Sequence, residues 1–316
     1  MSERLLAIDA GQSSVTARVV GDERQIELPG VRTDSALLPQ LADAVRAVVA
    51  SVGSVGAVAI GTTGLTVDES DPDELLRQLG DLSVTTVLLA HDSITSYLGA
   101  VGDVRGAVVA VGTGVVTLGV GRHEIARVDG WGNLFGDAGS GYWIGRAAFD
   151  AVMREYDGRG PKTALTARIR QEFPDLPSAY IELQGDPDRV RRIASYARVV
   201  DDLATEDAVA RRICDDAASE LVVSVGAALD RVGESAAESP RIGAIGGVLR
   251  SQRIGTAFAE GIRSRWPLAD LGPAVGVGLD GVQAMFGLTP GSALFSAVAR
   301  ATRSDFLVSA LDAEMQ

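Results

Sequence analysis

The 316-residue chain has few of the side chains from which disulfides and metal centres are built. Cysteine occurs once, at Cys214, and histidine twice, at His91 and His123. This supply excludes a disulfide framework or an iron–sulfur cluster within one chain and leaves little for a zinc site. We therefore expect a protein of the reducing cytoplasm. Cys214 is predicted to be a small buried residue of a helix, and His123 a solvated turn residue.

Lysine, basic surface and uninterrupted apolar runs are scarce as well. The one lysine, Lys162, lies in the sequence PKT, which excludes the Walker motif GxxxxGK[ST]. The net charge of −13 disfavours nucleic acid and anionic lipid as partners. Gly, Ser, Thr or Pro interrupt the longest uncharged runs, 47–67 and 281–299, and no signal-peptide pattern opens the chain. We therefore expect neither a membrane span nor a leader.

The content of 46% hydrophobic and 22% charged residues indicates a globular protein, and the length of 316 residues predicts two domains. Residues 5–30 and 107–130 share one order, namely apolar strand, glycine-rich turn, strand, charged turn and strand. Such self-similarity is what an internal duplication leaves. Helical and strand patterns then alternate, which predicts parallel pairing in an α/β sheet. The expected elements are helices at 34–51, at 71–79 and from Ser93, and strands at 55–60 and 84–89.

The second half of the chain is richer in helix. Four long amphipathic patterns precede a short buried strand, a Gly-Gly turn and a helix start at 241–251. The four patterns cover 140–156, 162–172, 189–203 and 206–232. We predict one α/β domain over residues 1–103 and a second over 104–316, with a helical insertion at about 140–235 and a ligand cleft between the domains.

Three turns at strand ends are candidates for ligand binding. They read IDAGQSS at 8–14, VGTGVV at 111–116 and IGGVLRS at 245–251. Glycine allows backbone N–H groups to approach a ligand closely, although any one of these turns could be an ordinary hairpin. Three of them, two inside the repeated segment, favour a common ligand.

At these residues the chain resembles the actin-like ATPase and sugar kinase superfamily, whose members close two ribonuclease-H-like domains around ATP and Mg²⁺. GWGNLFGDAGSGYWIG at 130–145 is similar to the signature GWGxxxGDEGSGxxIG of the N-acetylglucosamine kinase group within the BadF/BadG/BcrA/BcrD ATPase family. The helical pattern at 194–221 also resembles that family. The resemblance implies two ribonuclease-H-like domains and an ATP-dependent kinase of an amino sugar.

The resemblance also implies roles for individual residues. The turns at 8–14 and 111–116 would be the two phosphate loops for ATP, and the turn at 245–251 would be the adenosine motif. Asp9 would hold Mg²⁺; the competing interpretation of Asp9 is a carboxylate that only shapes its turn. The implied ATP contacts are Gly11, Ser13, Ser14, Gly112, Thr113, Gly114, Gly246 and Gly247. Asp92 matches the family's catalytic base, although a helix N-cap explains an Asp there equally well from position alone. His91 is expected to be structural.

The sugar site is implied at the signature, on Gly130, Trp131, Gly132 and Asp137. A carboxylate accepts hydrogen bonds from sugar hydroxyls, and an aromatic face packs on sugar C–H groups. Core packing for Trp131 and a loop cap for Asp137 are the alternatives, and Trp143 is expected to pack in the core.

Several positions depart from the family pattern. Ala138 replaces the usual Glu, Val115 and Val116 replace polar residues, and 30–35 lacks the usual Asn. Glucosamine, muramic-type sugars and other hexose derivatives therefore stay open beside N-acetylglucosamine. A nucleotide- or sugar-sensing protein without catalysis is the rival function, and the sequence leaves a homodimer open. The single cysteine disfavours the cluster-carrying activators and the zinc-containing repressor/kinase group.

Overall fold

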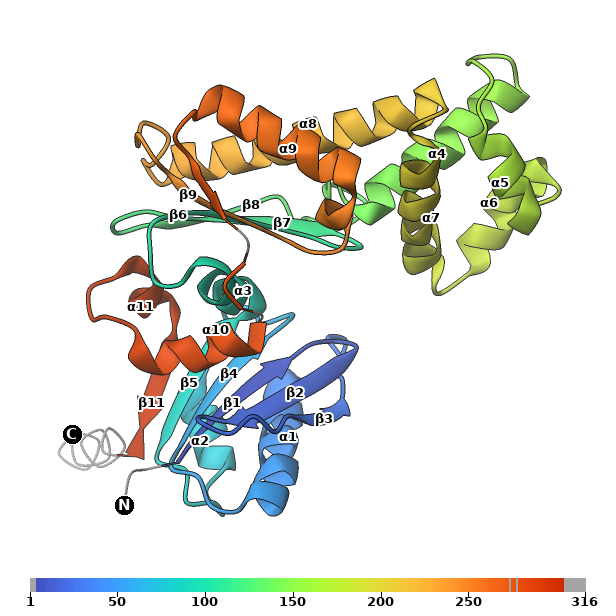
Figure 1. Cartoon of the computed structure of the whole chain (residues 1–316). Helices are drawn as coiled ribbons and strands as arrows, with labels where there is room; N and C mark the ends of the chain where they lie inside the picture. Colours follow the sequence, from blue (N-terminus) through green and yellow to red (C-terminus); the bar gives the residue numbers. More distant parts are fainter. Residues whose placement is uncertain (1–3, 273, 277, 304–316) are drawn as a thin grey trace. The chain divides into compact units, whose positions relative to one another are not determined.

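The computed structural model describes residues 4–272, 274–276 and 278–303 (Figure 1). Their contacts form two compact units. Unit 1 comprises the described residues within Met1–Val104, Arg122–Ile125 and Ala274–Gln316, and unit 2 those within Arg105–Gly121 and Ala126–Pro273.

Unit 1 is built on a six-stranded sheet in the order β11-β5-β4-β1-β2-β3. The strands are β1 (Leu5–Ala10), β2 (Ser14–Val19), β3 (Ile26–Pro29), β4 (Ala57–Thr62), β5 (Thr86–His91) and β11 (Ala299–Thr302). β1, β2 and β3 form an antiparallel meander, and β4 runs parallel to both β1 and β5. The parallel pairing expected from alternating strands and helices is confirmed. β4 is buried along its whole length, as expected for a strand covered on both faces.

The helices of unit 1 cover this sheet. They are α1 (Leu37–Val52), α2 (Pro72–Gln78), α3 (Asp92–Val101), α10 (Gly278–Ala284), the 3₁₀ turn η2 (Met285–Gly287) and α11 (Ala293–Ala297). α10 crosses α3 very closely, because a Cβ built at Gly281 would lie 1.7 Å from the carbonyl oxygen of Thr95. β11 pairs antiparallel with β5. These contacts return the chain to unit 1 after residue 273, whereas the sequence placed all of 104–316 in the second domain.

Unit 2 is built on a five-stranded sheet in the order β10-β9-β6-β7-β8. Its strands are β6 (Gly106–Val111), β7 (Val115–Val120), β8 (Ile125–Val128), β9 (Arg241–Ile245) and β10 (Asp270–Gly272). β6 and β7 are antiparallel, and β9 is parallel to β6 and to β10. The order β8-β7-β6-β9-β10 thus repeats the order β3-β2-β1-β4-β5 of unit 1. The internal repeat predicted from the sequence is confirmed.

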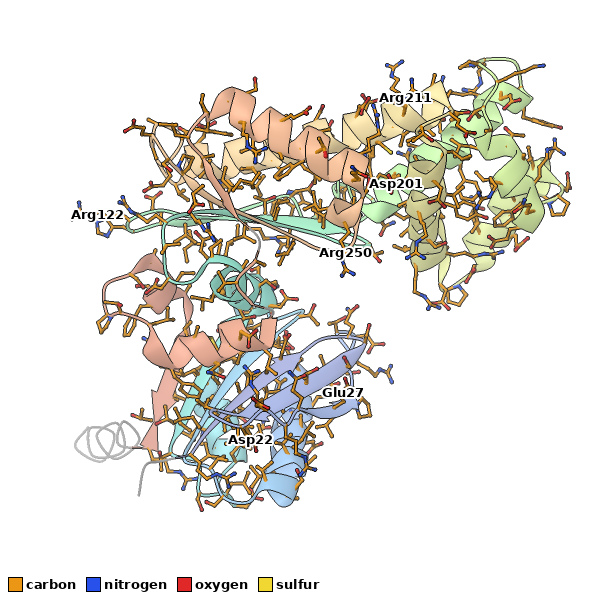
Figure 2. The ribbon with its side chains drawn as sticks, in the orientation of Figure 1. Asp22, Glu27, Arg122, Asp201, Arg211 and Arg250 are labelled. Atoms are coloured by element: carbon orange, nitrogen blue, oxygen red, sulfur yellow. The ribbon has the colours of Figure 1, made fainter. Side chains whose placement is uncertain are left out.

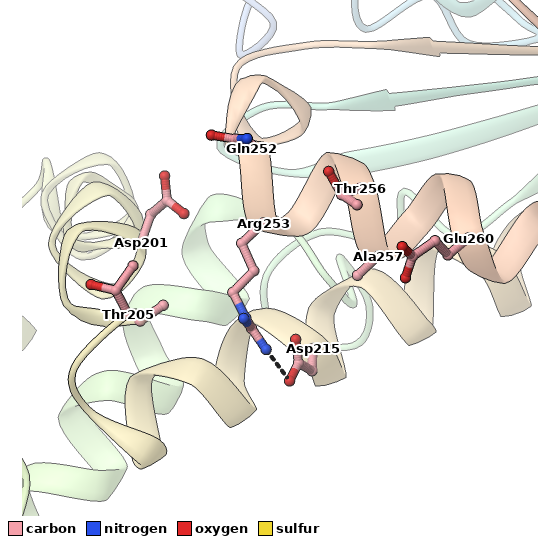
Figure 3. A pocket seen from close by; sticks show the side chains of 9 residues that line it. Asp201, Thr205, Asp215, Gln252, Arg253, Thr256, Ala257 and Glu260 are labelled. Atoms are coloured by element: carbon pink, nitrogen blue, oxygen red, sulfur yellow. Dashed lines mark hydrogen bonds and ion pairs between the residues drawn. The ribbon is translucent and has the colours of Figure 1, made fainter.

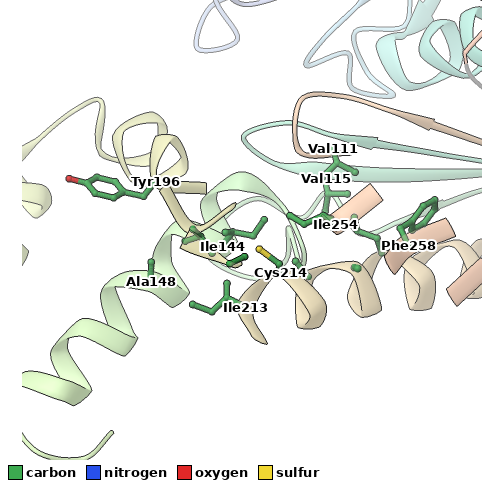
Figure 4. Close-up of a cluster of buried hydrophobic side chains, with 14 of the residues drawn as sticks. Val111, Val115, Ile144, Ala148, Tyr196, Ile213, Cys214, Ile254 and Phe258 are labelled. Atoms are coloured by element: carbon green, nitrogen blue, oxygen red, sulfur yellow. The ribbon is translucent and has the colours of Figure 1, made fainter. Parts of the chain in front are cut away.

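Most helices of unit 2 lie in the chain between β8 and β9. They are α4 (Gly141–Tyr156), α5 (Leu165–Glu172), α6 (Leu176–Gly185), α7 (Arg189–Leu203) and α8 (Ala208–Arg231); the 3₁₀ turn η1 (Val248–Arg250) and α9 (Gln252–Arg265) follow β9. α4, α8 and α9 share one apolar core with the sheet, in which Ile144, Cys214 and Phe258 are fully or almost fully buried (Figure 4). This core fixes the strand ends and helix starts that carry the candidate site.

Candidate active site

The sheet of unit 1 brings Asp9 and Asp92 together. β1, β4 and β5 are parallel neighbours, with Asp9 opposite Gly61 and Thr62 opposite His91, so the two carboxylates stand at the same edge. Burial raises the pKa of Asp9 to about 6, and the negative charge of Asp92 adds to this effect.

The Asp9 carboxylate has no hydrogen-bond donor among the described residues. It therefore does not shape its turn by binding backbone amides, which was the alternative interpretation. A Cβ built at Gly278, the first residue of α10, would lie 2.4 Å from its Oδ2 atom. The space beside Asp9 thus depends on a glycine that the sequence did not single out.

Asp92 is the first residue of α3, and its N-cap is His91. The Nδ1 atom of His91 accepts a hydrogen bond from the Ser93 N–H at 3.1 Å and lies 2.9 Å from Oδ1 of Asp92. The alternative that Asp92 caps the helix is therefore wrong, because the imidazole does so. The Asp92 side chain keeps 38% of its surface exposed and is accessible for chemistry.

The first turn joins β1 to β2. Gly11 donates its N–H to the carbonyl of Ser14, and the N–H of Val31 donates to the carbonyl of Gly11, both at 3.0 Å. Ser13 and Ser14 are exposed. The segment after β3 braces this turn: a Cβ built at Gly30 would lie 2.0 Å from the carbonyl oxygen of Gln12.

In unit 2 the second and third turns lie side by side, because β6 and β9 are parallel neighbours with Ala110 opposite Ile245. Gly246 has φ +109°, and a Cβ there would lie 2.0 Å from the carbonyl oxygen of Val111. Gly112, Thr113 and Gly247 line one pocket of about 570 Å³. The structure thus joins two of the predicted ATP-binding turns in one cavity.

Helix α7 and the 3₁₀ turn η1 form the other walls of this pocket, which we call the glycine pocket. α7 contributes Arg191, Ala194, Ser195, Ala197, Arg198 and Asp201. Arg250 of η1 also lines it, and Figure 2 labels Arg250 and Asp201. None of these residues was predicted individually. The spacing of 191, 194, 198 and 201 marks one helical face and could have indicated them.

The signature loop of unit 2 is held by Asp129, which the sequence did not identify as a functional residue. Its carboxylate accepts hydrogen bonds from the N–H groups of Gly130 at 2.7 Å, Asp137 at 2.7 Å and Ala138 at 3.0 Å. Asp129 and Asp137 have φ values of 58° and 61°, an uncommon conformation for residues with a Cβ. The loop is therefore a fixed structure rather than a flexible linker.

The signature residues differ sharply in exposure. Asp137 is 7% exposed, and its Oδ1 atom accepts a hydrogen bond from the Val115 N–H at 3.3 Å. Burial raises the pKa of Asp137, and the charge of Asp129 contributes to the increase. Trp131 is 61% exposed, with the Arg127 guanidinium 5.2 Å from its ring centre. Trp131 is therefore not a core residue, which was the alternative.

The departures from the family pattern that belong to unit 2, at 115, 116 and 138, lie around Asp137. Val115 is buried, and a Cβ built at Gly130 would lie 3.2 Å from the Cβ of Val116. A Cβ built at Gly114 would lie 2.8 Å from Oδ2 of Asp137, so Gly114 makes room for this carboxylate. Gly132, by contrast, faces open space. The surroundings of Asp137 are thus more apolar than the family pattern implies.

Three residues outside the site lie where the sequence predicts them, namely Cys214, His123 and Trp143. Burial raises the pKa of Cys214 to about 12, so its thiol stays protonated. His123 is exposed between β7 and β8, and Trp143 packs against the core.

The described residues contain no group of three or more His, Cys, Asp or Glu side chains arranged to hold a metal ion. None of the helices in the described part of the chain combines the length and apolar composition of a bilayer-spanning segment.

Two relatives are similar to this chain over about half its length. The N-acetylmuramic acid/N-acetylglucosamine kinase of Clostridium acetobutylicum is 35% identical over 180 residues, which is 54% of this chain and 57% of that protein. The N-acetyl-D-glucosamine kinase of Dictyostelium discoideum is 29% identical over 181 residues, 55% of this chain and 56% of that protein. The match thus spans little more than half the length of either relative.

Solved structures share the fold over most of the chain. A Chromobacterium violaceum protein provisionally named N-acetylglucosamine kinase matches with a TM-score of 0.67 and 22% identity, covering 89% of this chain and 97% of that one. A Porphyromonas gingivalis protein with the same provisional name matches with a TM-score of 0.66 and 20% identity, covering 90% and 99%. The sequence profile of the BadF/BadG/BcrA/BcrD ATPase family matches residues 6–276. The chain therefore belongs to the BadF/BadG/BcrA/BcrD ATPase family.

Proposed function

We propose that this protein is an ATP-dependent sugar kinase that transfers the γ-phosphoryl group of ATP to a hydroxyl of an amino sugar or related hexose derivative. The observation that carries the proposal is the glycine pocket, in which Gly112, Thr113 and Gly247 line one cavity. Gly112 and Gly247 both face open space, so their backbones are accessible to phosphate oxygens. Gly246 packs on the Val111 carbonyl next to this pocket. Gly11, Ser13 and Ser14 are proposed as further phosphate contacts.

The two carboxylates of unit 1 suit two different roles, a ligand of a divalent cation for Asp9 and a general base for Asp92. Asp9 is a partly buried carboxylate beside a second one, and both burial and repulsion favour its protonated form unless a cation is present. Asp9 would hold Mg²⁺ together with water and phosphate oxygens, and the ion would neutralise phosphate charge. Asp92 would orient the sugar hydroxyl and accept its proton while that oxygen attacks the γ-phosphorus.

Asp137 and Trp131 are proposed to bind the sugar. The carboxylate would accept hydrogen bonds from two hydroxyls, and the exposed indole face would pack on the C–H face of the ring. Gly130 and Gly132 would let backbone amides approach the same sugar. The relatives named above support an amino sugar. A cytoplasmic location is part of the proposal, because the single thiol suits a reducing compartment.

A coupled ADP-release assay with MgATP tests the proposal. The acceptors are N-acetylglucosamine, N-acetylmuramic acid, glucosamine and glucose, and a reaction without sugar is the blank. We expect sugar-dependent ADP release with at least one acceptor and detection of its phosphorylated product by mass spectrometry. Binding of ATP without phosphorylation of any acceptor would overturn the proposed kinase activity and favour a nucleotide- or sugar-sensing protein without catalysis.

A further inference from the structure

The glycine pocket needs positive charge that its glycine turns do not supply. Backbone amides and the Thr113 hydroxyl are neutral, whereas ATP carries several negative charges and the chain itself carries −13. The chain has one lysine, and Lys162 is not among the residues that line the pocket. Any full positive charge at this cavity must therefore come from arginine.

Three arginines line the glycine pocket, and the side chains of two of them have no partner among the described residues. Arg191 is paired with Asp188 at 3.0 Å and is 79% exposed. The side chains of Arg198 and Arg250 make no hydrogen bond, ion pair or ring contact with any residue in the described part of the chain. By contrast, Arg192, on the same helix as Arg198, holds three carboxylates. Of the three arginines that line the pocket, Arg198 and Arg250 are thus the ones left available for a ligand.

Asp201 lines both the glycine pocket and a second cavity of about 520 Å³, and the two cavities differ in the charge of their lining residues. That second cavity contains Asp215 and Glu260, and its one arginine, Arg253, is paired with Asp215 at 2.7 Å (Figure 3). Anionic groups are repelled there. On the other side, Asp201 is the one carboxylate among the residues that line the glycine pocket, and Arg198 and Arg250 outnumber it, so anionic groups are attracted there.

We infer that Arg198 of α7 and Arg250 of η1 bind the phosphate groups of the nucleotide, so that the helical insertion supplies half of the phosphate site. This inference rests on the proposed use of ATP. Guanidinium groups are well suited to the task, because their planar forks match phosphate oxygens. The glycine turns then provide close approach, and the two arginines provide charge.

The test measures ADP binding by isothermal titration calorimetry to the full chain and to the variants R198Q, R250Q and R198Q/R250Q. R189Q is the matched control, because Arg189 lies on α7 outside the pocket. We expect a Kd for ADP roughly tenfold higher in each single variant and roughly 100-fold higher in the double variant. Lysine in place of either arginine should restore part of the affinity, and adenosine binding should not change.

Thermal unfolding without ligand separates this role from a structural one, since removing an unpartnered arginine should leave the midpoint unchanged. The inference is overturned if the double variant binds ADP as the original chain does, or if adenosine binding weakens as much as ADP binding. In either case the sugar-dependent activity would still support the kinase. Failure of the original chain to bind ADP at all would overturn both.

Discussion

Units 1 and 2 share one five-strand arrangement but present different chemistry at the ends of their strands. Their first hairpins close at Ala10–Val15 and at Val111–Val115. Asp9 directly precedes Ala10 in β1, and Ala110 directly precedes Val111 in β6. Asp9 of unit 1 and Ala110 of unit 2 therefore occupy equivalent positions in the repeat. One copy of the repeat thus carries a carboxylate where the other carries a methyl group.

The comparison separates two tasks. Unit 1 holds Asp9 and Asp92 at one sheet edge, and its turn is braced by the segment after β3. In unit 2 the same edge is occupied by the glycine pocket, with a helical wall from α7. Under the proposed function, the repeated scaffold would place the catalytic carboxylates in one copy and the glycine pocket for the nucleotide in the other, so substitutions should affect the two tasks separately.

Asp92→Asn should give the largest effect. We expect kcat to fall by roughly 10²–10⁴-fold, because the amide cannot accept the hydroxyl proton. ADP affinity should change little, since the glycine pocket belongs to unit 2. Steady-state kinetics and calorimetry measure the two quantities. Near-normal turnover in this variant would show that Asp92 is not the base.

Asp129→Ala should weaken sugar binding by the signature loop of unit 2. The variant leaves three backbone N–H groups without their acceptor and releases a loop that contains two residues at positive φ. We expect the KM for the sugar to rise roughly 10–100-fold with little change in ADP affinity. Asp150→Ala on α4 is the control, because among the described residues its carboxylate forms one ion pair, with exposed Arg154. An unchanged sugar KM would contradict the role of Asp129.

Gly246→Ala and Gly247→Ala form a matched pair at the third turn. A methyl group at 246 would lie 2.0 Å from the Val111 carbonyl oxygen at positive φ, whereas a methyl group at 247 meets open space. We expect Gly246→Ala to lower the free energy of unfolding by about 2–4 kcal/mol. Gly247→Ala should keep stability and weaken ADP binding a few-fold. Denaturant unfolding and calorimetry distinguish them, and equal stabilities would refute the packing argument.

Asp9→Asn should show a smaller, pH-dependent effect on stability. The folded state raises the pKa of Asp9 from 3.8 to about 6, so this group stabilises the fold fully below pH 3.8 and loses that contribution as pH rises through 6. Without cation or nucleotide, the variant should therefore be about 2–3 kcal/mol more stable than the original chain at pH 8. The two should not differ near pH 3.5.

The unfolding midpoint at both pH values measures this difference. Asp22→Asn is the control, because Asp22 lies in the exposed turn after β2. A stability gain of Asp9→Asn that did not depend on pH would point to a cause other than the ionised carboxylate. The same variant should lose sugar phosphorylation.

Much of the fold was predictable because the patterns are local. Alternation and apolar runs located β4, β5 and β9, and helical spacing located α7 at its observed bounds, Arg189–Leu203. The sequence assigned the described residues after 273 to the other unit. Their membership depends on the crossing of α10 with α3 and the pairing of β11 with β5, which are contacts between residues far apart in sequence.

The sequence by itself determined the repeated strand order, the three glycine turns and the carboxylates at strand ends, since each depends on neighbouring residues. Only the tertiary structure decided that His91 rather than Asp92 caps α3, and that Asp129 holds the signature loop. It also decided that α7 lines the glycine pocket with Arg198. The physical reason is that hydrogen bonds, burial and charge act between atoms in space, and their partners here lie on different elements or compete for the same donor.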